Sequence, residues 1–124
     1  MPHYTVISAD IVYDGFDVVL DRCFDDSDPG ESFDSSIYDI NDIRRQIDLG
    51  HMEWFVLRAR ATVQGHTLGT AYIGGCLYQA DSVKDVLTDG IGEDCVADAV
   101  QQAKQNVSRL LPRLTQLAAQ AEQL

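Results

Sequence analysis

Carboxylates are the side chains of this chain that are best able to bind a partner or a cation, and they are concentrated in its N-terminal part. Residues 1–48 hold twelve acidic residues against three arginines, a net charge of −9, whereas residues 49–124 carry only −2. A field of this sign repels nucleic acid and anionic membranes and attracts basic protein surfaces. The candidate binding residues are the acids of the first strand pair and the loop after it: Asp10, Asp14, Asp17, Asp21, Asp25, Asp26, Asp28, Glu31 and Asp34.

Part of this acidic segment also has the residue types of a calcium loop. Hard cations take several carboxylate oxygens, which Asp25, Asp26, Asp28 and Glu31 would supply. The spacing does not fit an EF-hand, however, because Gly30 stands where a third ligand belongs and Glu31 stands where the glycine should be. The three histidines form no i, i+4 pair either. We therefore expect no metal site and no cofactor.

The cysteines and glycines give no sign of an enzyme. Cys23, Cys76 and Cys95 are odd in number and lack C-x-x-C spacing, which is typical of reduced thiols in a cytoplasmic protein. No nucleophile elbow, glycine-rich phosphate loop or His–Glu zinc pair is present. No apolar run is long enough to span a membrane, and residues 1–10 do not have the pattern of a signal peptide. We expect a non-enzymatic cytoplasmic protein that does not contact membranes.

Whole-chain composition adds a resemblance to this picture. Sixteen of the twenty acidic residues are Asp, and only two of the nine basic residues are Lys. In length, acidity, Asp content and absence of catalytic motifs the chain resembles small phage and plasmid proteins that block host defence, namely DNA-mimic antirestriction proteins and anti-CRISPR inhibitors. The likeness lies in composition and involves no motif. It implies an inhibitor that occupies the nucleic-acid-binding surface of a defence complex.

The acids of the first segment must be positioned by a hairpin or by a helix. Asp10, Asp14, Asp17 and Asp21 fall at helical spacing, but Asp14-Gly15 is a strong hairpin turn. A two-residue loop there places apolar residues on one face, pairing Tyr13 with Phe16, Ile11 with Val18, and Ala9 with Leu20. Because a slip by one residue would bury the aspartates, we predict the hairpin.

A second hairpin is predicted around Gln64-Gly65, pairing Ala61 with Leu68, Ala59 with Thr70, and Leu57 with Tyr72. Its opposite face carries Arg58 and Arg60. If the hairpins adjoin, these arginines lie on the same side as Asp10, Asp17 and Asp21 and neutralise part of the charge. Trp54 lies on that side too, and is either an aromatic anchor for a partner or packed under a loop. Gly74 and Gly75 are expected to end or bulge the last strand.

Three helices complete the prediction. Residues 25–35 read as an exposed loop, followed by a short helix capped by Ser36 with Asp39, buried along Ile37, Ile40, Ile43 and Ile47, and ended at Gly50. Residues 81–88 form a second short helix, and a long helix begins near Glu93. Its apolar residues keep heptad spacing: Val96, Val100, Ala103, Val107, Leu110, Leu114, Leu117, Ala121 and Leu124. Pro112 predicts a kink and not a stop.

The segment beyond Pro112 is too long for one small sheet to cover. It either projects and binds a partner or a second copy through Leu110, Leu114, Leu117 and Leu124, or folds back onto its own core.

Together these patterns predict an α+β fold with an antiparallel sheet of about four strands in two hairpins, covered by helices, in the order ββαββα(α). One domain is expected over 1–124, made of an acidic ββα unit (1–50), a hairpin (52–78) and C-terminal helices (81–124). The expected function is inhibition by nucleic-acid mimicry, through a basic surface of a nucleic-acid-binding protein or complex. The alternative is a homo-oligomeric adaptor joined through the C-terminal helix.

Overall fold

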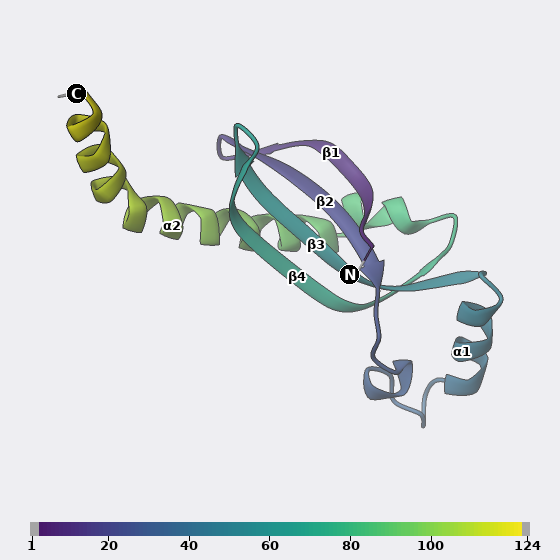
Figure 1. The fold of residues 1–124 in the computed structure, drawn as a ribbon. Coiled ribbons are helices and arrows are strands. Elements are labelled where there is room, and N and C mark those ends of the chain that lie inside the picture. The colour runs from purple at the N-terminus through teal and green to yellow at the C-terminus, as the bar shows by residue number, and fades with distance from the viewer. Residues whose placement is uncertain (1–2, 123–124) are drawn as a thin grey trace.

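The computed structural model describes residues 3–122, and its centre is a four-stranded antiparallel sheet. The strands are β1 (Thr5–Tyr13), β2 (Phe16–Phe24), β3 (Met52–Val63) and β4 (His66–Gln79), and they lie in the order β1-β2-β3-β4 (Figure 1). Each strand pairs antiparallel with the next one in sequence: β1–β2 and β3–β4 are hairpins, and the pairing of β2 with β3 joins them. The predicted sheet of two adjoining hairpins is confirmed.

Both hairpin turns lie where the sequence places them. Asp14 and Gly15 have φ of 49° and 86°, and Gln64 and Gly65 have φ of 49° and 81°. Two consecutive left-handed residues make the tight turn whose twist matches that of the flanking strands, and Asp-Gly is well suited to it. The pairs Tyr13–Phe16 and Ile11–Val18 are confirmed, but a bulge in β1 places Ser8 opposite Leu20 and leaves Ala9 exposed.

The second hairpin departs further from its predicted register. A bulge at Leu68 shifts β4, so that Ala61 lies opposite Gly69, Ala59 opposite Ala71, and Leu57 opposite Ile73. The shift brings Gly69 against the C-terminal helix, where a Cβ would clash with the backbone of that helix. Close packing of the helix therefore decides the register. Gly75, with φ of 69°, lies in a second irregularity, and β4 continues to Gln79 and does not end there.

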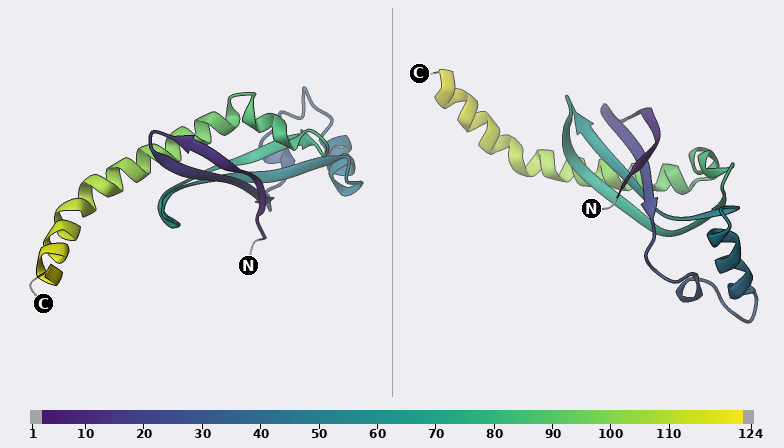
Figure 2. Two further views of the ribbon diagram at one scale, coloured as in Figure 1. Left: turned by 90° about the horizontal axis from the view of Figure 1, so that it is seen from above. Right: turned by 45° about the vertical axis from the view of Figure 1, so that its right-hand side comes forward.

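One helix covers the sheet. This is α2 (Ile91–Glu122), which runs along one face while the opposite face has no helix over it (Figure 2). The core between α2 and the sheet includes Val18, Leu20, Leu57, Cys95 and Val100, each at most 1% exposed. Small residues line the crossing and allow the backbones to approach: Ala59, Ala61, Gly69, Ala99 and Ala103.

The shorter helices differ from their predictions. The predicted element order ββαββα(α) is therefore not matched either. The segment predicted as a helix over 81–88 is a 3-10 helix, η2 (Val83–Leu87), and a further one, η1 (Pro29–Glu31), interrupts the predicted loop. α1 (Ile40–Asp48) begins four residues after Ser36, because Asp39 caps it by accepting from Asp42 N at 3.1 Å.

The predicted buried stripe of α1 is wrong. α1 lies beyond the end of the sheet (Figure 1), so Ile37 is 73% exposed and the isoleucines at 40, 43 and 47 are only half-buried. Gly50 follows the helix with φ of 78°, as predicted for the residue after its end.

Helix α2 continues unbroken through Pro112, and its last turns bend away from the direction of the first ones (Figures 1 and 2). Pro112 removes one backbone donor, which is a sufficient cause for a bend. The helix extends well beyond the sheet, so the alternative in which it folds back onto its own core is wrong. We call residues 104–122 the distal helix and residues 3–103 the body.

Candidate functional site

Asp21, one of the predicted binding acids, is in the interior. It is 1% exposed and binds two arginines of β3. Arg58 donates from Nε to Oδ1 at 2.8 Å and from Nη2 to Oδ2 at 2.6 Å, and Arg60 donates from Nη2 to Oδ2 at 3.2 Å. The predicted neutralisation by these arginines is thus confirmed for Asp21. A carboxylate so enclosed is not available to a partner.

The environment of Arg58 shows how this ion pair is shielded. Its guanidinium carbon lies 3.4 Å from the centroid of the Tyr4 ring, close enough for a cation–π interaction. The hydrogen bonds that Arg58 donates to the Asp21 carboxylate raise the pKa of Arg58 above its ordinary value. Arg58 therefore contacts both the Tyr4 ring and the Asp21 carboxylate, on the sheet face that no helix of residues 3–122 covers.

Asp25 is a second buried acid, 7% exposed, and it anchors the loop after β2. It accepts hydrogen bonds from Ser27 N at 2.9 Å, Ser27 Oγ at 2.7 Å and Gly75 N at 2.8 Å. Burial alone would raise the pKa of Asp25, but these hydrogen bonds outweigh it and hold the pKa below its ordinary value. Asp25 thus ties the loop to the bulge in β4.

The same loop covers Trp54, which is 2% exposed. Its Nε1 donates to the Ser27 carbonyl at 2.9 Å, and its ring packs against Phe33 with the ring centroids 5.8 Å apart. Of the two interpretations of Trp54, packing under a loop is confirmed and the partner anchor is wrong.

Three more of the predicted acids are exposed but engaged within the chain. Asp14 binds Lys104 of α2 at 2.6 Å, and Asp28 binds Arg44 of α1 at 2.6 Å. Asp34 accepts from both the backbone and the hydroxyl of Ser36. Hydrogen bonds from Arg44 and Ser36 lower the pKa of Asp28 and of Asp34 respectively. These carboxylates hold the loop and helix in place.

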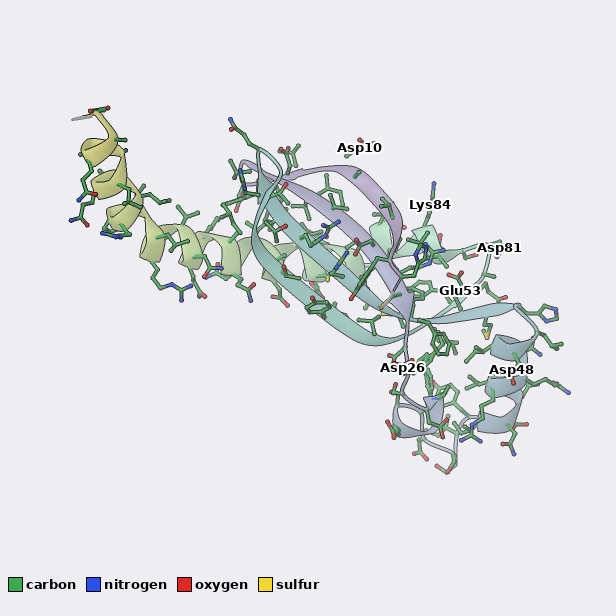
Figure 3. The ribbon with its side chains drawn as sticks, viewed as in Figure 1. Asp10, Asp26, Asp48, Glu53, Asp81 and Lys84 are labelled. Carbon is green, nitrogen blue, oxygen red and sulfur yellow. The ribbon has the colours of Figure 1, made fainter. Side chains whose placement is uncertain are left out.

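The remaining predicted acids are Asp10, Asp17, Asp26 and Glu31. All four are exposed, and within residues 3–122 none has a cationic side chain within 4 Å. Figure 3 shows Asp10 on β1 and Asp26 in the loop, at different ends of the sheet. The nine predicted acids therefore do not form one continuous patch.

A second group of acids was missed from the sequence. Residues 81–98 carry Lys84 and six acids, a net charge of −5: Asp81, Asp85, Asp89, Glu93, Asp94 and Asp98. All six are exposed: Asp85 on η2, Asp81 and Asp89 in the turns on either side of it, and the other three on the first turns of α2. A net charge summed over residues 49–124 conceals these acids, because the other basic residues of that range, on β3 and on the C-terminal part of α2, offset their charge. A sliding charge count would have found them.

The acidic and basic residues separate more clearly when the chain is divided into the body and the distal helix than when it is divided at residue 48. The body carries −13, and the distal helix, with Lys104, Arg109, Arg113 and Glu122, carries +2. The distal helix also carries the apolar residues that the heptad pattern assigned to a partner. Leu110 is 41% exposed, Leu114 56% and Leu117 42%, and Leu111 beside them is 55% exposed. Leu124 lies outside the described residues.

Two of the three cysteines are buried, and burial shifts the pKa of their thiols. Burial raises the pKa of Cys76 to about 11 and that of Cys95 to about 12, so both stay neutral thiols near pH 7. Within residues 3–122 no group of three or more His, Cys, Asp or Glu is arranged to hold a metal ion. Nor does that part of the chain contain a helix long and apolar enough to cross a membrane.

Comparison with known proteins gives no family model that matches the chain, and no curated protein or solved structure that is significantly similar to it. The function is therefore inferred from the residues of the chain itself.

Proposed function

We propose that this protein is a non-enzymatic binding protein whose acidic body engages the basic, nucleic-acid-binding surface of another protein and inhibits it by nucleic-acid mimicry. The observation that carries the proposal is the charge of −13 on the body, together with ten exposed acids in two groups (Asp10, Asp17, Asp26 and Glu31, and the six acids of residues 81–98). A basic groove that grips phosphates through Lys and Arg is attracted to carboxylates by the same charge-dependent force.

The fold supports this role by holding the acids on rigid elements. Asp10 and Asp17 are on paired strands, and Glu93, Asp94 and Asp98 are on the part of α2 that packs on the sheet. The internal ion pairs also remove competing cations from the surface, because Arg58 and Arg60 are occupied by Asp21 and Arg44 by Asp28. Carboxylates held in fixed positions lose little conformational freedom when a partner binds.

Capture from a cell extract of the source organism tests the proposal, with duplex DNA added to compete. Protein immobilised through its C-terminus should retain a nucleic-acid-binding protein at low salt, and excess duplex DNA should displace it. Retention of proteins that DNA does not displace, or of none, would contradict mimicry.

Two sets of substitutions with equal charge loss locate the surface. The first removes four charges from the front group (Asp10→Asn, Asp17→Asn, Asp26→Asn, Glu31→Gln), and the second removes four from residues 81–98 (Asp81→Asn, Asp85→Asn, Glu93→Gln, Asp98→Asn). We expect one set to weaken capture at least tenfold more than the other, because a mimic presents its charges in a defined arrangement. Equal small effects would mean that the acids only give the protein its net charge.

A further inference from the structure

We infer that two copies of this chain pair antiparallel through the apolar stripe of the distal helix, centred on Leu114. The stripe consists of Val107, Leu110, Leu111, Leu114, Leu117, Ala118 and Ala121, one side of the helix over about two heptads. This inference is independent of the proposed binding to a basic surface, which involves the body.

The stripe is continuous with the part of α2 that forms the core. Val96, Val100 and Ala103 hold the same heptad phase and are at most 4% exposed under the sheet. At the hairpin tips, Asn106 donates to the Leu68 carbonyl at 2.6 Å and Lys104 binds Asp14 at 2.6 Å, so the helix leaves the sheet in a fixed direction. The apolar side is therefore presented by a rigid support.

The exposed area fits a weak but specific contact. The four leucines of the stripe expose, in sum, about two whole leucine side chains per chain, or about four per pair. Every position of the stripe is Val, Leu or Ala, so no buried polar group opposes self-pairing. With only two heptads, we expect a dissociation constant in the micromolar range.

Charge selects both the occupant and the orientation. A parallel pair would place two bodies of −13 side by side at the same end, where they repel each other. An antiparallel pair centred on Leu114 places the ends of the two bodies, at residue 103 of each copy, about 33 Å apart at the rise of an α-helix, which exceeds two Debye lengths at physiological salt. The basic distal helices then lie between two acidic bodies.

The flanking residues agree with this alignment. When Leu114 lies opposite its own copy, Arg113 lies at the level of Thr115 of the second copy and Arg109 at the level of Ala119. Glu122 lies beside the segment of the second copy that carries Lys104 and Arg109. Opposed helix dipoles also favour the antiparallel arrangement.

Sedimentation of the full chain across the micromolar range tests the pairing. The wild type should change from monomer to dimer, and Leu114→Asp/Leu117→Asp should raise the dissociation constant at least about 100-fold, because two leucines per chain lose their contacts. The matched control, Gln105→Asp/Gln116→Asp, adds the same charge on the opposite side of the same helix and should leave dimerisation within about threefold of wild type.

Three other results of these measurements would overturn the proposed dimer. A wild type that stays monomeric throughout, or a dimer that the leucine changes leave intact, would overturn the inference. At a concentration well below the dissociation constant, where both variants are monomers, circular dichroism should show the same thermal transition for both, because these leucines are exposed in the monomer. A large loss of stability in Leu114→Asp/Leu117→Asp alone would mean that the stripe is internal core, and would also overturn it.

Disulfide cross-linking tests the orientation. In a Cys23→Ser background, a mixture of Leu110→Cys and Ala118→Cys chains should form the mixed disulfide, because residues 110 and 118 face each other when the helices are antiparallel about Leu114. Homodisulfides of Leu110→Cys alone would indicate a parallel pair and would overturn the antiparallel assignment.

Discussion

Removal of the Asp21 carboxylate tests the assignment of this acid to the interior. Asp21→Ala leaves the guanidiniums of Arg58 and Arg60 without their carboxylate, although both arginine side chains reach water, being 18% and 34% exposed. Loss of one partner of a fully buried pair costs about 3–5 kcal/mol, and the access to water reduces this to about 2–3 kcal/mol here. Asp21→Asn should cost less, because the amide oxygen still accepts one of these hydrogen bonds.

Urea unfolding followed by circular dichroism measures both changes against a matched control. Asp17→Ala removes the same group from the same strand and the same face of the sheet, but Asp17 is exposed and has no cation within 4 Å among residues 3–122. Its cost should stay within about 0.5 kcal/mol. If Asp21→Ala costs no more than Asp17→Ala, the buried ion pair does not stabilise the fold and the reasoning above fails.

Three further predictions concern packing and thiols. Gly69→Ala should destabilise the fold by about 1–3 kcal/mol in the same urea assay, because a Cβ at residue 69 clashes with the backbone of α2. The control Gly74→Ala should be tolerated, because its Cβ would lie 3.5 Å from its nearest neighbour. Equal costs for the two variants would refute the close crossing of α2 and β4. The unfolded thiol has an ordinary pKa of 9.0, so folded Cys76 and Cys95 keep their protons to higher pH than unfolded ones, and the free energy of unfolding should fall as pH rises from about 9 to about 12. At pH 8 a thiol reagent should modify half-buried Cys23 quickly and the other two only after denaturation; rapid modification of all three would contradict their burial.

The fold was predictable where local chemistry decides it. The turns at Asp14-Gly15 and Gln64-Gly65 and the unbroken helix through Pro112 follow from residue types and periodicity. The bulges at residues 9–10 and at Leu68 were not predictable from simple alternation, and the one at Leu68 accompanies the close packing of Gly69 against α2. The prediction that the isoleucines of α1 are buried was wrong because an apolar stripe in the sequence does not show which surface, if any, packs against it.

The candidate site was predictable as a set of charges and not as a surface. Alternation along the strands placed Asp21 on the same side as Arg58 and Arg60, but alternation does not show how completely these side chains enclose it. Asp25 is buried because Gly75, fifty residues later, donates to it. The acidic group of residues 81–98 was hidden by bases that the fold places elsewhere.

The most direct measurement of the central claim is the affinity for the captured partner as a function of salt. Mimicry of nucleic acid predicts that the dissociation constant rises at least about tenfold between about 50 mM and about 500 mM NaCl, because the contact is made between carboxylates and Lys or Arg. An affinity that is unchanged or strengthened over this range would show that the contact is apolar, and would contradict the account.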